Sequence, residues 1–178
     1  MNNKGDTILI HGTMVCVHNL GVLITGRSGI GKSESALELI RRGFFLVADD
    51  GITITRGSDN LSAEAPELTR NIIEVKGVGV IDVEDFRRDS VFNRKSIDFA
   101  VDLVDFDPEV HLARIEIEST EWTCLGVDVT KYSVPVLDNR ETANVIEILA
   151  ALISNGINPA RAGKNLLKKH SSKISGQA

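Results

Sequence analysis

The hydrophobic positions in the first third of the chain predict two strands followed by a helix. Mostly apolar residues occupy 13–17 and again 22–25. Apolar positions then recur at helical spacing within 36–40, and Gly43 ends that pattern. The short apolar run 44–48 follows, between this helix and a pair of carboxylates, which favours a buried parallel strand of a strand–helix–strand unit.

Further along the chain, short β-prone runs alternate with turn residues, at 72–75, 78–83, 99–104, 112–117 and 132–136. An apolar periodic stretch from Thr142 to about Leu152 indicates a helix. Asn158 and Pro159 are typical of the N-cap and first residue of a last, basic helix. The pattern therefore predicts an α/β fold with a β-rich second half.

Length and composition limit the class of protein. The 178 residues are near the usual size of one domain, and 42% hydrophobic with 25% charged residues is ordinary for a folded globular chain. We expect one domain over 1–172 and a disordered tail over 173–178. Cys16 and Cys124 lie in apolar runs and form no metal-binding pair, which predicts two buried thiols.

The charge balance argues against nucleic acid or a membrane as the main partner. The chain has 25 acidic and 20 basic residues, a net charge of −5, whereas surfaces that bind nucleic acid or anionic lipid are strongly basic. No stretch resembles a signal peptide or a membrane span, so we expect a cytoplasmic protein. The segment after Glu147 is basic. Such a run is usually a solvated face, although it could meet an acidic surface of a neighbouring subunit or protein substrate.

A phosphate-binding motif, GxxxxGK[ST], lies between a predicted strand and a predicted helix, the context that this motif requires. Its residues are Gly26, Arg27, Ser28, Gly29, Ile30, Gly31, Lys32 and Ser33. Glycines let successive backbone N–H groups point inward around an anion, and the helix adds the positive end of its dipole. Lys32 would then reach the β- and γ-phosphates, and the Ser33 hydroxyl would ligate Mg²⁺. A nucleoside triphosphate with Mg²⁺ is the expected ligand; the alternative is a glycine-rich turn without a ligand.

Two adjacent carboxylates, Asp49 and Asp50, follow the apolar run 44–48. They should emerge at the carboxyl edge of the sheet, beside the phosphate loop. One would support the metal, and the other could take a proton from an attacking hydroxyl as general base. Alternatively, the pair caps a turn, or both carboxylates act through metal-bound water.

Several blocks of sequence accompany the phosphate loop in a fixed order. They are His11-Gly12 with the lead 20–25, the run 33–39 with Arg42-Gly43, 46–50, 73–81 and Val134-Pro135-Val136 ending in Arg140. The run 73–81 is similar to the signature E-I-R-G-L-G-I-I. With these blocks, the chain resembles HPr(Ser) kinase/phosphorylase, a bifunctional bacterial sensor enzyme, over nearly its whole length.

The resemblance implies an enzyme that uses ATP to phosphorylate a serine of an HPr-like phosphocarrier. It also implies the reverse reaction, phosphorolysis by inorganic phosphate with release of pyrophosphate. The fold implied is a P-loop kinase core similar to the phosphoenolpyruvate carboxykinase type, and the implied assembly is a homohexamer. Neither nucleic acid nor a membrane is an expected partner.

The resemblance also assigns roles to residues of this chain. Asp50 becomes the acid/base, which accepts a proton in the forward direction and donates it in reverse. His11 and Lys32 become active-site residues, and Arg140 becomes a catalytic cation of the loop after the last strand. Because phosphorolysis brings together two anions, cations such as Lys32 and Arg140 are needed to neutralise their repulsion.

By the same resemblance, Ser33 and Glu74 become the ligands of Mg²⁺. Each assignment has a plainer alternative when the residue is taken alone. His11 could be a polar strand end. Glu74 could face solvent from an alternating strand, and Arg140 could be a solvated charge or a partner of Asp138.

The chain also departs from the family pattern. Arg27 replaces the usual Asp of the phosphate loop, which adds a cation there. Lys76 replaces the Arg of the signature, which keeps the charge but loses the bidentate fork. The stretch 86–91 differs from the family's F-G-A-G-A-V. By the resemblance we expect the chain to be a short form of the family, the catalytic core without the separate N-terminal domain.

Two functions of other classes remain open from the sequence. One is a regulatory protein that binds a nucleotide without transferring phosphate, and the other is a P-loop kinase of a small molecule. The substitution Asp50→Asn separates the first from an enzyme, because an enzyme should keep nucleotide binding and lose transfer.

Overall fold

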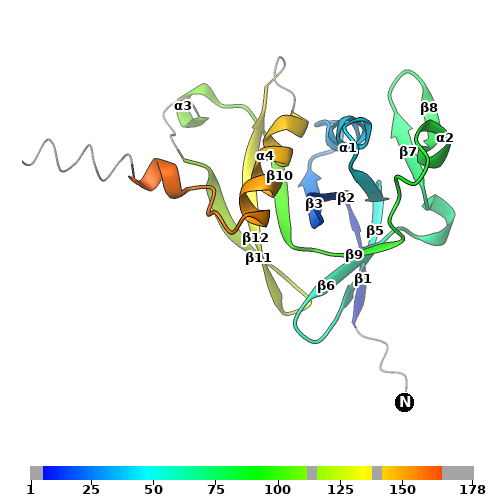
Figure 1. Ribbon diagram of the computed structural model, residues 1–178, viewed down its shortest axis with the longest axis horizontal. Helices are drawn as coiled ribbons and strands as arrows, with labels where there is room; N and C mark the ends of the chain where they lie inside the picture. The colour runs from blue at the N-terminus through cyan, green and yellow to red at the C-terminus, as the bar shows by residue number, and fades with distance from the viewer. Residues whose placement is uncertain (1–5, 112–115, 138–141, 166–178) are drawn as a thin grey trace, which may run out of the picture.

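A mixed six-stranded sheet forms the centre of the computed structural model, which describes residues 6–111, 116–137 and 142–165 (Figure 1). The strand order is β11-β12-β10-β3-β2-β4. In chain order these strands are β2 (Thr13–Val17), β3 (Leu20–Gly26), β4 (Phe45–Ala48), β10 (Phe99–Asp105), β11 (Glu118–Cys124) and β12 (Val127–Val136). Because β3, β10 and β12 are parallel, their carboxyl ends meet at one edge.

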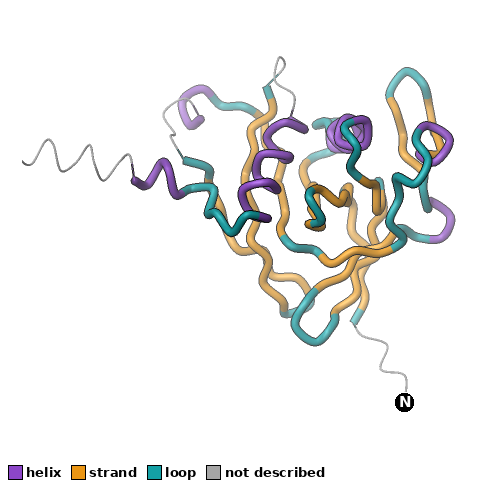
Figure 2. The backbone as a smooth tube through the Cα atoms, in the orientation of Figure 1, coloured by secondary structure: helices purple, strands orange, loops and turns teal. Residues whose placement is uncertain are grey.

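Two helices cover one face of this sheet. Figure 2 shows α1 (Lys32–Arg41) and α4 (Thr142–Ser154) on the same side of the strands. Alternate strand side chains, such as Val22 and Ile24 of β3, pack with Leu39 and Ile146 of these helices in one hydrophobic core. Burial of this apolar face is the main stabilising contribution here.

A second, four-stranded sheet covers the other face. Its order is β1-β5-β6-β9, formed by β1 (Thr7–His11), β5 (Gly51–Arg56), β6 (Leu61–Glu64) and β9 (Arg94–Ser96). Met14 and Leu23 of the central sheet pack with Ile52 and Ile54 of β5 in a second core. Since β2 and β3 are buried on both faces, their sequences are almost continuously apolar rather than alternating.

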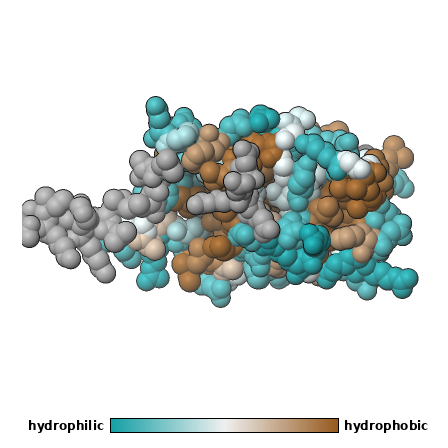
Figure 3. All heavy atoms as spheres, turned by 90° about the horizontal axis from the view of Figure 1, so that it is seen from above, coloured by the Kyte–Doolittle hydropathy of each residue, from teal (hydrophilic) through white to brown (hydrophobic). Residues whose placement is uncertain are grey.

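A third, two-stranded sheet stands at one end of the molecule (Figure 1). It consists of β7 (Ile72–Val75) and β8 (Gly79–Asp82), flanked by the 3₁₀ turn η1 (Glu67–Thr69) and by α2 (Val83–Phe86). Val78 and Val80 are 73% and 69% exposed there. The view from above in Figure 3 shows hydrophobic surface at this end of the molecule.

The predicted elements agree with the structure at most positions. The runs 13–17 and 72–75 coincide with β2 and β7, and the helix from Thr142 coincides with the start of α4. The strand predicted over 112–117 is wrong where it can be checked. Glu116 and Ile117 are not in a strand, β11 begins at Glu118, and 112–115 lie outside the described residues. The α/β class itself is confirmed.

The run 44–48 forms strand β4, but the parallel pairing predicted for it is wrong. β4 lies at the sheet edge and pairs antiparallel with β2. The physical reason is a tight hairpin: His18 and Asn19 have φ of 48° and 64°, which turns β2 directly into β3 and occupies that edge of β3. β3 and β4 still run in the same direction, with β2 between them, so both end at the same sheet edge.

Two further expectations concern the cysteines and the last helix. Cys16 and Cys124 are free and buried as predicted, and burial raises the pKa of both thiols. Asn158 Oδ1 accepts a hydrogen bond from the Ala160 N–H at 2.9 Å, as predicted for a capping side chain, but 159–160 form a turn and the helical residues run over 161–165, so the helix begins two residues later than predicted. The predicted tail, 173–178, lies outside the described residues. Within the described ranges no helix is long and apolar enough to cross a membrane.

Candidate active site

The phosphate loop joins the carboxyl end of β3 to α1. Gly26 has φ 135°, and a Cβ there would lie 2.7 Å from the Leu103 carbonyl oxygen of β10, so only glycine fits. Gly31 is the N-cap of α1 with φ 108°. The backbone N–H groups at the start of α1 therefore face the loop with the positive end of the helix dipole.

Lys32 is buried against this loop. Its Nζ donates hydrogen bonds to the carbonyl oxygens of Gly26 and Arg27, both at 3.1 Å. These contacts fold the ammonium back over the loop, where an anion bound by the backbone would meet it.

Asp49 is a fixed, buried carboxylate at the end of β4. It is 3% exposed, and its Oδ1 accepts hydrogen bonds from the hydroxyls of Thr13 at 2.7 Å and Ser33 at 3.0 Å. The side chain thus connects β2, β4 and the first turn of α1. Ser33 and Asp49, both predicted near a metal, lie in direct contact.

Asp50 has the opposite environment. Its side chain is 82% exposed, and its Oδ1 lies 3.0 Å from Nδ1 of the half-exposed His11. The backbone has φ 63°, and the Gly51 N–H donates to the Asp49 carbonyl oxygen at 2.8 Å, which closes a tight turn around Asp50. Apart from Gly, mainly Asn and Asp adopt this left-handed conformation readily, so the turn restricts which residues fit at position 50.

The β7–β8 hairpin contributes the opposite wall. Glu74 of β7 and Lys76, the residue after this strand, line the cleft opposite the loop, and Lys76 Nζ lies 3.4 Å from Glu34 Oε1 of α1. Together the walls enclose a cleft of about 250 Å³. It is lined by His11, Thr13, Ser28, Gly29, Gly31, Lys32, Ser33, Glu34, Asp49, Asp50, Glu74 and Lys76.

Most residues selected from the sequence therefore line one cleft, but four do not. Gly26 packs against the Leu103 carbonyl oxygen of β10. Ile30 is buried in the core beneath the loop, so only its backbone is available to a ligand. Arg27 points away to Asp105, with N···O distances of 2.7 and 2.9 Å, and its guanidinium holds the pKa of that carboxyl below its usual range. Arg140 lies outside the described residues.

The donor set suits a hard cation. No group of three or more His, Cys, Asp or Glu side chains in the described ranges could hold a metal alone. The hydroxyl of Ser33 and the carboxylates of Asp49 and Glu74 instead offer a few oxygen atoms beside the phosphate loop. Mg²⁺ is typically held in this way, by one or two carboxylates and substrate phosphates.

Sequence reasoning missed Thr13 and Glu34. Thr13 is fully buried and fixes Asp49, and Glu34 pairs with Lys76 across the cleft. A hydroxyl in an otherwise apolar strand was the available signal for Thr13, since a buried polar group needs a partner. The Glu34 contact depends on where the hairpin packs, which no local pattern specifies.

Comparisons with known proteins agree with this arrangement. The sequence profile of the HPr Serine kinase C-terminal domain matches residues 4–170. The chain is 43% identical to the HPr kinase/phosphorylase of Caldanaerobacter subterraneus subsp. tengcongensis over 145 residues, which is 80% of this chain and 48% of that protein. It is 36% identical to the HPr kinase/phosphorylase of Geobacillus thermodenitrificans over 171 residues, 95% of this chain and 54% of the relative.

The solved structure of the Hpr(Ser) kinase/phosphatase from Coxiella burnetii superposes with a TM-score of 0.73 at 32% identity. That match covers 81% of this chain and 94% of the other. The chain spans about half the length of the curated relatives it matches.

Proposed function

From the premise that this chain belongs to the HPr Serine kinase C-terminal domain family, we propose that it transfers the γ-phosphate of ATP to a serine of an HPr-like phosphocarrier. We further propose that it reverses this step by phosphorolysis, in which inorganic phosphate takes up the phosphoryl group to give pyrophosphate. The expected hexamer and the cytoplasmic setting are parts of the same proposal.

In the forward direction the serine oxygen attacks the γ-phosphorus and the bond from phosphorus to the β–γ bridging oxygen breaks. The serine proton passes to Asp50, whose exposed carboxylate is the one that an incoming acceptor can reach. His11, 3.0 Å from Asp50, orients that carboxylate. The loop N–H groups and Lys32 stabilise the charge on the departing ADP.

In the reverse direction an oxygen of inorganic phosphate attacks the phosphorus of phosphoserine. The bond from phosphorus to the serine oxygen breaks, and protonated Asp50 returns its proton to that oxygen. Two anions must approach one another here, so Lys32 and Lys76 in the cleft, with Arg140 added by resemblance, are assigned to offset their repulsion.

We assign Mg²⁺ to the side of the cleft formed by Ser33, Asp49 and Glu74. When bound, the ion supplies charge neutralisation of the β- and γ-phosphate oxygens. Asp49 holds the Ser33 hydroxyl at 3.0 Å and is itself held by Thr13, so its part is to fix the oxygen atoms around that position.

The single observation that carries the proposal is the exposed Asp50 carboxylate at the lip of the phosphate cleft, in contact with His11. A protein that only binds a nucleotide has no need of a solvent-facing carboxylate there.

A protein acceptor is favoured over a small molecule by the surface next to the cleft. Val78 and Val80, together with Phe86, form an exposed apolar patch on the hairpin and helix that follow Glu74 and Lys76. Exposed apolar patches at a site rim mark protein–protein contacts. A small-molecule kinase would need to enclose its substrate instead.

The test is incubation with γ-labelled ATP and a purified HPr-like protein from the same organism, with a serine-to-alanine form of that protein as control. We expect label on the serine-containing form alone, and release of labelled pyrophosphate when inorganic phosphate is added. ATP binding without transfer to any HPr-like protein would favour the regulatory alternative, and ATP turnover that requires a metabolite would favour the small-molecule kinase.

A further inference from the structure

The acid/base groups of the cleft all lie on one side of β3. Asp49 and Asp50 follow β4, His11 lies 3.0 Å from Asp50, and Figure 1 shows the β7–β8 hairpin that carries Glu74 at the end of the molecule away from β10 and β12. In the central sheet, β10 and β12 lie on the other side of β3 from β4. A bound triphosphate must therefore direct its terminal phosphate toward β4. Its nucleoside must extend the opposite way, across the carboxyl ends of β10 and β12.

A continuous path of hollows leads in that direction. Gly31 and Glu34 line the phosphate cleft and also a second hollow of about 280 Å³ between α1 and the start of α4. Thr142 lines this second hollow and also a third cavity at the carboxyl end of β12. Neighbouring strands are about 4.8 Å apart, so β12 lies about 10 Å from β3, a span that a ribose can bridge.

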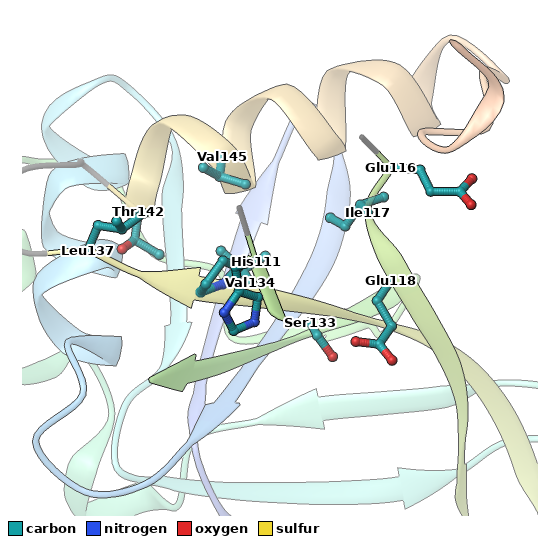
Figure 4. Close-up of a pocket in the computed structure, with 10 residues that line it drawn as sticks. His111, Glu116, Ile117, Glu118, Ser133, Val134, Leu137, Thr142 and Val145 are labelled. Carbon is teal, nitrogen blue, oxygen red and sulfur yellow. The ribbon is translucent and has the colours of Figure 1, made fainter. Parts of the chain in front are cut away.

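The third cavity has about 220 Å³ and combines apolar walls with a polar end. Val134 and Val145 supply apolar wall from β12 and α4 (Figure 4). Figure 4 shows the hydroxyl of Ser133 and the carboxylate of Glu118 on one side, with the ring of His111 nearby. This volume is below the roughly 300–1,000 Å³ of sites for whole drug-sized ligands, so it suits one ring system.

We infer that this third cavity, lined by Val134, Val145, Ser133, Glu118 and His111, holds the heteroaromatic base of the bound nucleotide. The inference rests on the proposed function for the identity of the ligand and adds the part of the protein that recognises it. The apolar walls cover the faces of the base, and the polar end offers hydrogen-bond partners to its edge.

Methyl NMR of the unaltered protein tests this directly. A bound base shifts nearby methyl resonances through its ring current, whereas inorganic tripolyphosphate occupies the loop and has no ring. We expect Mg·ATP to shift the methyl signals of Ile117, Val134 and Val145, and Mg·tripolyphosphate to leave them in place. The Ile54 methyl, in the other core, is the internal reference. Saturating ATP that moves none of the three signals beyond the tripolyphosphate effect would overturn the inference.

A substitution that fills the cavity gives the second test. Val145→Phe should weaken ATP binding about tenfold or more and leave tripolyphosphate binding unchanged, because only the base loses its place. Ile148→Phe, at a position of the same helix that is 59% exposed, is the matched control and should alter neither. Equal weakening of both ligands, or of neither, would contradict the inference. If Val145→Phe does not fold, the methyl shifts of the unaltered protein decide alone.

Failure of the inference and failure of the proposed function give different results. Normal ATP-induced methyl shifts without phosphoryl transfer would overturn the proposed function and support the base site. Phosphoryl transfer from ATP without those methyl shifts would support the proposed function and overturn the base site. Absence of binding by both ATP and tripolyphosphate would contradict both.

Discussion

Asp49 and Asp50 are neighbours in the chain but have opposite environments. Asp49 is 3% exposed and accepts hydrogen bonds from two hydroxyls, whereas the Asp50 side chain is 82% exposed and its Oδ1 lies 3.0 Å from His11 Nδ1. A carboxylate fixed on two donors is suited to hold a metal-binding hydroxyl in place. One that faces solvent is suited to exchange a proton with an acceptor that arrives from outside.

Removal of the His11 imidazole should slow transfer without weakening ATP binding, because the His11 ring lies 3.0 Å from the Asp50 carboxylate, which it orients. We expect His11→Asn to lower kcat about tenfold, with the Kd for ATP unchanged. His18→Asn is the matched control: the His18 ring packs against Phe44 outside the cleft, and Asn tolerates its positive φ. Steady-state kinetics with calorimetry checks this. Equal loss of kcat in both variants would contradict the orienting role.

The left-handed backbone at Asp50 should make the free energy of unfolding depend on the residue type at position 50. Asn and Gly tolerate φ 63°, whereas Ala does not. Since Asp50→Asn, Asp50→Gly and Asp50→Ala all lack the carboxylate, their comparison isolates the backbone. Urea unfolding should give a free energy of unfolding about 1 kcal/mol lower for the Ala variant than for the Asn variant. Equal values for all three would mean that the turn is not strained.

The pairing of Arg27 with Asp105 should appear in the pH dependence of that carboxyl. Arg27 holds the folded-state pKa of Asp105 below its usual range, so the pair stabilises the fold above the ordinary Asp pKa of about 3.9 and loses this effect as pH falls through the lowered value. In Arg27→Gln, carboxyl NMR should show Asp105 titrating at higher pH. Arg41→Gln, which removes a partner of Glu38, should leave it unchanged. An unshifted Asp105 in Arg27→Gln would contradict the pairing.

The apolar patch on the hairpin should matter for the protein acceptor alone. We expect Val80→Ser to raise the KM for the carrier protein about fivefold and to leave the Kd for ATP unchanged, because Val80 is 69% exposed and outside the phosphate cleft. Ile148→Ser removes an exposed apolar side chain from α4 and serves as control. An unchanged KM for the carrier would place acceptor binding elsewhere.

The sequence was sufficient for the phosphate loop and for most elements that carry it. The motif over 26–33 is local, and the strands and helix on each side have clear periodicity. That β3 and β4 end at the same edge was also inferred correctly, because a helix connects them. The antiparallel pairing of β4 with β2 was not inferred, because it depends on the hairpin at His18 and Asn19. These residue types are a less distinctive hairpin signal than Asn-Gly.

Other parts of the site depend on contacts between distant segments. Whether Asp49 or Asp50 is buried depends on the Thr13 hydroxyl of β2 and on the turn closed by Gly51. Arg27 contacts Asp105, 78 residues away, whereas its replacement of the family's usual Asp predicted an additional cation at the phosphates. Local patterns carry no information on such pairs, so the fold was needed to separate the roles of the two carboxylates.

The most direct test of the central claim is the rate of phosphoryl transfer in Asp50→Asn, measured together with ATP affinity. The substitution keeps the size and backbone preference of residue 50 and removes its ability to accept a proton. We expect an ATP Kd within about twofold of the unaltered protein and transfer to the carrier serine reduced about 10²- to 10⁴-fold, with Asp59→Asn unaffected. Transfer at the unaltered rate by Asp50→Asn would contradict the assignment of Asp50 as the acid/base.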